Sequence, residues 1–260
     1  TLTINKAGTV TVKAVRAGDD CYNDSDEISY TLKINRAGQT GFAFEKQNPA
    51  TITYKPGLTF ENAATGGQNA GNVTYTITSG KDVASIDDSN GTLTINKAGT
   101  VTVKATRAAD DKYNEVTAEY TLTINKADQT HFAFEKPNPE ARTYKPGLTF
   151  ENKASSDQGA DNVTYTITSD NGVASIDIYG TLTILKAGDV TVKATRAADD
   201  KYNEVTAEYT LTINKADQTN FAFENQNPEA ITYDPKNNTF SNKASSDQGA
   251  DNVTYTITSD

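Results

Sequence analysis

Residues 91–130 read GTLTINKAGTVTVKATRAADDKYNEVTAEYTLTINKADQT, and this stretch is the clearest repeating segment of the chain. It recurs at residues 180–219, and a diverged copy opens the chain at residues 1–40. Residues 101–130 and 190–219 are identical at all 30 positions. The chain is therefore a tandem repeat with a period of about 90 residues, which suits one small domain per repeat and is too long for a solenoid unit.

Each repeat carries the alternating pattern of β-strands. From Val116 to Ile124 every second residue is apolar, and Thr and Glu occupy the positions between. A period of two predicts a strand with one buried face. Turn residues separate such strands, and we expect residues 96–99, NKAG, to close a short hairpin because the glycine can adopt a positive φ.

About seven strands are predicted in each repeat, with turn signals roughly every eight to twelve residues. In chain order, and in the lettering of the repeat, they are FAFE, the TYKPGLTF region, NVTYTITS, VASID, GTLTIN, TVTVKATRA and EVTAEYTLTIN. Many short strands in a unit of this size are typical of a sandwich of two β-sheets. The predicted fold class is therefore all-β, with one β-sandwich per repeat.

A family resemblance lies in the second half of the repeat. VASID at 83–87, NGTLTI at 90–95 and KAGTVTV at 97–103 together resemble the bacterial immunoglobulin-like (Big) domain. The acidic loop DDKYN at 110–114 is similar to loops in long, repetitive bacterial surface proteins. The resemblance implies tandem Ig-like β-sandwiches in an exported stalk or adhesin, usually without enzymatic activity. It brings no functional residues with it.

Domain boundaries follow if FAFE is the first strand of each sandwich. Two whole repeats are then predicted at 39–127 and 128–216, with the C-terminal half of a repeat at 1–38 and the N-terminal half at 217–260. No Gly/Ser-rich or Pro-rich linker separates the repeats, so we expect an elongated, stiff rod.

The two half-repeats have two explanations. The chain contains no methionine, even at position 1, which indicates a piece of a longer polypeptide, and the halves are then a window on a longer polymer or the result of trimming. Alternatively, the C-terminal half of one molecule pairs with the N-terminal half of the next, which would generate a head-to-tail filament.

Composition excludes several kinds of function. The net charge of −10 argues against binding to nucleic acid or anionic lipid, and the sequence has no run of 18 apolar residues that could insert into a membrane. A single histidine, His131, is replaced by Gly41 and Asn220 in the other copies, so no repeated catalytic role depends on it. Cys21, the only cysteine, stands where Lys112 and Lys201 stand. We expect no enzymatic activity.

The acidic loops are the sharpest candidate for a binding site. Clustered oxygen ligands suit Ca²⁺, which takes six to eight of them in flexible geometry. Asp and Asn in such loops also commonly cap their own backbone, which is the alternative. The calcium candidates are Asp110, Asp111, Asn114, Glu115, Asp199, Asp200, Asn203 and Glu204. No other cofactor is expected.

Together these observations predict a structural stalk or fibre at the bacterial cell surface or outside the cell. Its expected partners are the neighbouring repeats of the same chain, a second copy through head-to-tail association, and a host or surface ligand on a distal region. The alternative function is a module that binds carbohydrate or a host protein through its inter-strand loops.

Overall fold

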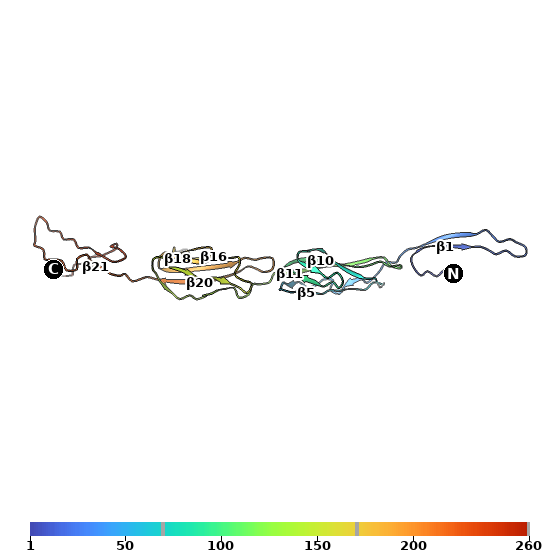
Figure 1. Ribbon diagram of the computed structural model, residues 1–260, viewed down its shortest axis with the longest axis horizontal. Helices are drawn as coiled ribbons and strands as arrows, with labels where there is room; N and C mark the ends of the chain where they lie inside the picture. The colour runs from blue at the N-terminus through green and yellow to red at the C-terminus, as the bar shows by residue number, and fades with distance from the viewer. Residues whose placement is uncertain (69–70, 170–171, 259–260) are drawn as a thin grey trace. The chain divides into compact units, whose positions relative to one another are not determined.

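The computed structural model describes residues 1–68, 71–169 and 172–258, and all regular secondary structure in these ranges is β-strand (Figure 1). Contacts divide the chain into two compact units, one made of residues 1–130 with 196–205 and the other of residues 131–195 with 206–260. Each unit has its own buried core. The predicted all-β class of tandem Ig-like sandwiches is confirmed.

The first unit contains two main sheets and two small strand pairs. Strands β4, β11, β10 and β7 form one sheet in that order, β5, β9 and β8 form the other, β3 pairs with β6, and β1 pairs with β2. The bounds are β1 (Gly8–Ala14), β2 (Ile28–Ile34), β3 (Ala43–Phe44), β4 (Ile52–Thr53), β5 (Thr59–Phe60), β6 (Ala64–Thr65), β7 (Val73–Ser79), β8 (Ala84–Ile86), β9 (Leu93–Ile95), β10 (Gly99–Arg107) and β11 (Val116–Asn125).

The core of the first unit lies where the inward faces of these sheets meet. Strands β10 and β11 are antiparallel, and Val103 lies opposite Tyr120. The ring of Tyr120 meets Phe44 of β3 edge-on, with ring centroids 4.5 Å apart. Leu93 of β9 and Leu122 of β11 are fully buried in the same cluster. Burial of alternate residues along β11 therefore confirms the predicted period of two.

The second unit repeats this architecture. Strands β13, β20, β19 and β16 form one sheet, β14, β18 and β17 the other, and β12 pairs with β15. The bounds are β12 (Ala133–Phe134), β13 (Arg142–Thr143), β14 (Thr149–Glu151), β15 (Ala154–Ser155), β16 (Val163–Ile167), β17 (Ala174–Ile176), β18 (Thr181–Ile184), β19 (Gly188–Arg196) and β20 (Val205–Asn214). Phe134 and Tyr209 meet edge-on at 4.6 Å, as their counterparts do in the first unit.

The predicted hairpin at residues 96–99 is wrong. Strand β9 pairs with β5 and β8, whereas β10 pairs with β11 and β7, so the segment carries the chain from one sheet to the other. The amides of Asn96 and Lys97 donate to the Val83 carbonyl, and Gly99 has a φ of 145° with no room for a side chain beside Val83. Strands from two sheets that pack on one core show the same alternation of buried apolar and exposed polar residues as two strands of one hairpin do. The sequence around residues 96–99 therefore could not distinguish a hairpin from a crossover between sheets.

The two ends of the chain form isolated strand pairs. Strands β1 and β2 make a hairpin near the N-terminus, and β21 (Ala222–Phe223) pairs with β22 (Ala244–Ser245) near the C-terminus. Most of their apolar residues are exposed, unlike the equivalent residues in the two cores. The boundaries at 38, 127 and 216 stay predictions. The contacts differ from these boundaries in one respect. Residues 196–205 lie within the predicted repeat at 128–216, but their contacts assign them to the first unit.

Candidate functional site

The acidic loop between the last two long strands of each repeat is a polar feature that recurs through the chain. Its first aspartate caps the loop, since Asp110 Oδ1 accepts the backbone N–H groups of Lys112 at 2.8 Å and Tyr113 at 2.7 Å. Asp199 does the same for Lys201 and Tyr202, both at 2.7 Å. The loop conformation is therefore fixed by the aspartate that begins it.

These backbone hydrogen bonds also set the acidity of the two aspartates. The N–H groups of Lys112 and Tyr113 favour the charged carboxylate and lower the pKa of Asp110. At Asp199 the largest effect is burial, which raises the pKa, but the bonds from Lys201 and Tyr202 help to outweigh it and the net shift is downward. Both carboxylates are consequently charged at neutral pH and oriented toward their own loop.

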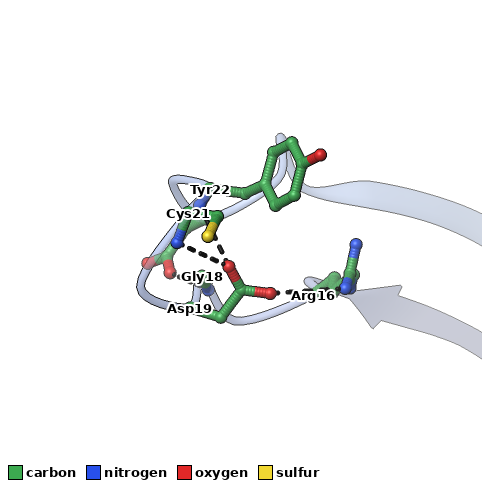
Figure 2. A network of polar contacts seen from close by, with 6 residues as sticks. Arg16, Gly18, Asp19, Cys21 and Tyr22 are labelled. Carbon is green, nitrogen blue, oxygen red and sulfur yellow. Dashed lines mark hydrogen bonds and ion pairs between the residues drawn. The ribbon is translucent and has the colours of Figure 1, made fainter.

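The N-terminal copy of the loop has the same cap (Figure 2). Asp19 Oδ1 accepts the N–H groups of Cys21 at 2.9 Å and Tyr22 at 3.0 Å, and its other oxygen lies 3.7 Å from the Arg16 guanidinium. Cys21 is a free, exposed thiol. In Figure 2 the Tyr22 ring points away from the loop, and this residue is 71% exposed.

Several of the residues predicted to bind calcium already form hydrogen bonds within the protein. The Asn114 amide donates to the Arg36 carbonyl at 3.3 Å, and the Asn203 amide donates to Asp128 Oδ1 at 2.8 Å. Across residues 1–68, 71–169 and 172–258, no group of three or more His, Cys, Asp or Glu side chains is placed to hold a metal ion. Calcium binding by the eight named residues stays a prediction for titration to decide.

The backbone of the loop at 199–203 docks on the segment that enters the second repeat. The Ala127 N–H donates to the Lys201 carbonyl at 2.9 Å, and the Asn203 N–H donates to the Ala127 carbonyl at 2.8 Å. Both partners thus lie within the first unit. This pair of bonds is a short parallel β-bridge between Ala127 and Tyr202.

A buried glutamine completes this docking. Gln129 donates from Nε2 to the Asn203 carbonyl at 2.6 Å, and its Oε1 accepts a hydrogen bond from the Arg196 guanidinium. Gln129 and Arg196 are both buried. A buried charge is tolerated only where polar groups surround it, so the Arg196–Gln129 contact favours one geometry of the loop.

An aromatic contact joins the loop to the first core. The Tyr202 ring stands perpendicular to Tyr54, with centroids 5.8 Å apart, and packs against the first hydrophobic cluster. Lys201 Nζ lies 6.0 Å from the centre of the same Tyr54 ring. Ala98, in the crossover between the sheets, donates its N–H to the Asp200 carbonyl at 3.0 Å. A loop from the second repeat in sequence is thereby part of the first unit.

The preceding copy of the loop makes the same backbone contacts. Ala37 donates to the Lys112 carbonyl and Asn114 to the Ala37 carbonyl, each at 2.8 Å, and Ala7 donates to the Asp111 carbonyl at 2.9 Å. Sequence reasoning singled out the loop but missed its partners, which are Gln39, Gln129, Ala37, Ala127 and Tyr54. The signal that could have found them is the recurrence of RAGQT or KADQT before each DDKYN loop, at separations that differ by a single residue.

His131, which the sequence marked as non-catalytic, forms an exposed ion pair within the second unit. Its Nδ1 lies 2.7 Å from Asp157 Oδ2. This hydrogen bond, with the charge of Asp157, raises the pKa of His131. The pair lies on the surface, where such contacts contribute little to stability.

One known protein family matches part of the chain. Residues 46–117 match the family described as Bacterial Ig-like domain (group 2), which confirms the resemblance predicted from the sequence for that segment. No curated protein matches the chain. Across the described ranges, no helix is long and apolar enough to cross a membrane.

Several solved structures are similar in fold. Human protocadherin-24 EC1-2 is 14% identical, with a TM-score of 0.32 over 68% of this chain and 98% of that one. Mouse clustered PcdhgC3 EC1-3 is 15% identical, with a TM-score of 0.35 over 81% and 77% of the two chains. BT4661, a SusE-like surface located polysaccharide binding protein from Bacteroides thetaiotaomicron, is 16% identical, with a TM-score of 0.27 over 82% and 39%. At these values the likenesses carry no argument about function.

Proposed function

We propose that this chain is a structural, non-enzymatic region of a bacterial cell-surface or extracellular protein. Its Ig-like repeats act as a stiff stalk or fibre that extends an adhesive region away from the cell. The match of residues 46–117 to a bacterial Ig-like domain supports the bacterial setting and the structural class. Each of the two units has its own cluster of buried apolar side chains, which suits a mechanical role.

The observation that carries the proposal is the docked loop at 196–205. By sequence it belongs to the repeat at 128–216, yet its hydrogen bonds to Ala127 and Gln129 and its ring contact with Tyr54 place it in the first unit. Backbone pairing, a buried polar contact and an aromatic contact hold this loop on the first unit, so the loop contributes to the stability of that unit. A spacer that must stay folded under force needs modules stabilised in this way.

An excision of one repeat tests the proposal. Residues RAGQT at 36–40 stand where KADQT stands at 126–130, so joining Thr40 directly to His131 removes one repeat and leaves Ala37 and Gln39 to hold the loop at 199–203 as they hold the loop at 110–114. The maximum dimension from small-angle X-ray scattering should then fall by about 30–40 Å, which is roughly the length of a ten-residue strand with its turns. An unchanged maximum dimension would contradict a spacer.

The competing function, a module that binds carbohydrate or a host protein through its loops, makes a different prediction for the same excision. A spacer keeps the affinity of the distal adhesive region and loses only reach. A binding module instead loses affinity in steps as repeats are removed. Measuring adhesion of the parent protein with and without the excised repeat distinguishes the two functions.

A further inference from the structure

We propose that each unit contains a mechanical clamp, which is the parallel strand pair β4–β11 in the first unit and β13–β20 in the second. The assignment rests on the spacer function proposed above, because such a clamp is of use only to a chain under tension. It concerns each unit by itself, since the paired strands lie within one sandwich.

The clamp joins a strand near the beginning of each sandwich to the strand at its end. In the first unit β4 and β11 run parallel, with Ile52 opposite Ile124. The second unit repeats the pairing, with Arg142 opposite Ile213. In the same sheet of the first unit β10 pairs antiparallel with both β11 and β7. The parallel pair is therefore distinct from the rest of its sheet.

The direction of the two strands decides how tension loads the clamp. Tension along the chain pulls β4 from its start, at Ile52, and β11 from its end, at Asn125. In a parallel pair these two points lie at opposite ends, so the strands are pulled past each other along their length. The hydrogen bonds between them are then loaded together, whereas strands pulled from the same end separate one bond at a time. The clamp is consequently loaded in shear, which is the direction in which a strand pair resists most.

Backbone hydrogen bonds hold the clamp together in both units. The Tyr54 N–H donates to the Asn125 carbonyl at 2.8 Å, and the Tyr144 N–H donates to the Asn214 carbonyl at 2.9 Å. Successive N–H groups of a strand point to opposite sides, so the N–H of Arg142, two residues before Tyr144, also faces β20. Proline at position 142 would remove this donor from the clamp.

Apolar side chains surround the clamp of the first unit. Ile124 is 2% exposed, Tyr54 is buried, and Ile52 packs against the first hydrophobic cluster. Hydrogen bonds in such surroundings are stronger than hydrogen bonds at a wet surface. In the second unit Arg142 stands in the place of Ile52 and is exposed. A substitution at position 142 therefore changes the clamp without opening a cavity in a core.

A buried asparagine gives the entering chain a second anchor. Asn62, which is 2% exposed, accepts the Lys46 N–H at Oδ1 and donates from Nδ2 to the Lys46 carbonyl, both at 2.9 Å. The fully buried Asn152 makes the same two bonds with Lys136. Pulling this segment away would leave a buried amide without partners, which costs free energy. The segment that leads into β4 or β13 is thus tied to the sandwich before the clamp begins.

In the first unit the docked loop adds a third connection. Its Tyr202 ring meets the ring of Tyr54, which follows β4, with centroids 5.8 Å apart. Its backbone pairs with Ala127, which lies just beyond the end of β11, through hydrogen bonds of Lys201 and Asn203. One loop therefore contacts the continuation of both clamp strands.

Single-molecule force spectroscopy of the full 260-residue chain tests the clamp by changing the direction of pulling. In a Cys21→Ser background, one variant carries its handles on Glu140→Cys and Lys215→Cys, which load β13 from its start and β20 from its end. The other carries them on Lys145→Cys and Lys215→Cys. Lys145 and Lys215 line the same hollow, so these handles load the strand pair from one end. All three handle positions are exposed.

The two variants differ in the direction of the force and in little else. The chain between the handles spans about 70–75 residues in both, so each should lengthen by roughly 200–270 Å when the second unit unfolds. At equal loading rates the rupture force should be severalfold higher for handles at 140 and 215. Equal forces, or a higher force for handles at 145 and 215, overturn the proposal. Because both variants keep β13 and β20 unchanged, the comparison does not require a substitution in the clamp.

Substitution of Arg142 tests the backbone hydrogen bonds of the clamp. With handles at 140 and 215, Arg142→Pro should lower the rupture force toward that of the other pulling direction. Arg142→Ala loses the same side chain but keeps the N–H, and should retain most of the force. Leu182→Ala, at a fully buried position of the other sheet, lowers equilibrium stability and should reduce the force less than Arg142→Pro. Equal forces for Arg142→Pro and Arg142→Ala contradict the clamp, and the two pulling directions decide the matter if Arg142→Pro prevents folding.

The clamp and the spacer function can fail separately. A second unit that ruptures at the same force in both directions, in a chain that still shortens when one repeat is excised, refutes the clamp and leaves the spacer function standing. A second unit that resists shear, in a chain that does not shorten on excision, refutes the spacer and keeps the clamp. Force spectroscopy and scattering are independent measurements on the same protein.

Discussion

Replacing Tyr202 with alanine is expected to destabilise the first core, although Tyr202 lies in the second repeat of the sequence. The ring is half-buried and packs edge-on against Tyr54 at 5.8 Å. It belongs to the side chains that surround the first hydrophobic cluster. The substitution removes this contact while leaving the Asp199 cap and the backbone bridge to Ala127 in place.

The magnitude follows from the area and the ring geometry. An aromatic side chain buries about 150–250 Å², and half of that area at about 25 cal/mol per Å² corresponds to about 2–3 kcal/mol as an upper value. The edge-on pair adds about 1 kcal/mol. Allowing for relaxation, we expect a loss of about 2–3 kcal/mol, so amides in the centre of β11 should exchange hydrogen roughly 30- to 150-fold faster.

Hydrogen exchange resolved by residue is the assay, because it reports the first core separately from the second. Tyr202→Phe retains the ring and should change the exchange of the first core little. Tyr22→Ala, at an exposed equivalent position, should have no effect on the exchange of the first core. If Tyr202→Ala leaves the amides of β11 unchanged, the loop does not stabilise the first unit and the reasoning fails.

Four further outcomes are expected. Leu122→Ala, at a fully buried position, should lower the free energy of unfolding of the first core by about 2–5 kcal/mol in urea titrations followed by hydrogen exchange. Burial raises the pKa of Tyr120 to about 12, and among the described residues its buried hydroxyl has no hydrogen-bond partner, so Tyr120→Phe should stabilise the same core by up to about 1–3 kcal/mol in the same titrations. The pKa of His131 is raised in the folded state, so the stability that its ion pair contributes is fully present below the unfolded pKa and is lost as pH rises through the folded pKa. Asp157→Asn should therefore move the titration midpoint of His131 to lower pH in an NMR titration. If the acidic loops bind Ca²⁺, the melting temperature should rise with added Ca²⁺ and fall with EDTA, and equal values would eliminate that prediction.

The strands and the inward-facing residues could be predicted from the sequence because they depend on local alternation. The pattern from Val116 to Ile124 identified one face of β11, and Tyr120, Leu122 and Ile124 are buried on that face. Repetition then extended each assignment to the second unit. Alternation does not identify the sheet to which a strand belongs, which is why residues 96–99 were misassigned as a hairpin.

The docking of the acidic loop could not be predicted from the loop itself. Its aspartate, lysine and asparagine fit a solvated turn or an ion site equally well, and the contacts that decide between them come from Gln129 and Tyr54, about 70 and 150 residues away in sequence. Gln129 is polar and Tyr54 stands beside a turn, so neither lies in an alternating pattern of apolar residues that would mark it as buried. Such nonlocal polar contacts require the three-dimensional fold.

The differences between the copies of the loop show which of its groups matter for docking. The first copy replaces lysine with Cys21 but keeps the capping Asp19 and the ring of Tyr22. At this position Lys112 and Lys201 contribute their backbone carbonyls to the bridge, which any residue supplies. The lysine side chain adds only a cation near the Tyr54 ring at 6.0 Å, a contact worth about 0.5–1 kcal/mol at an exposed site. The position that varies is thus the one whose side chain the docking needs least, and the residues that fix the loop and fill the aromatic contact are present in all three copies.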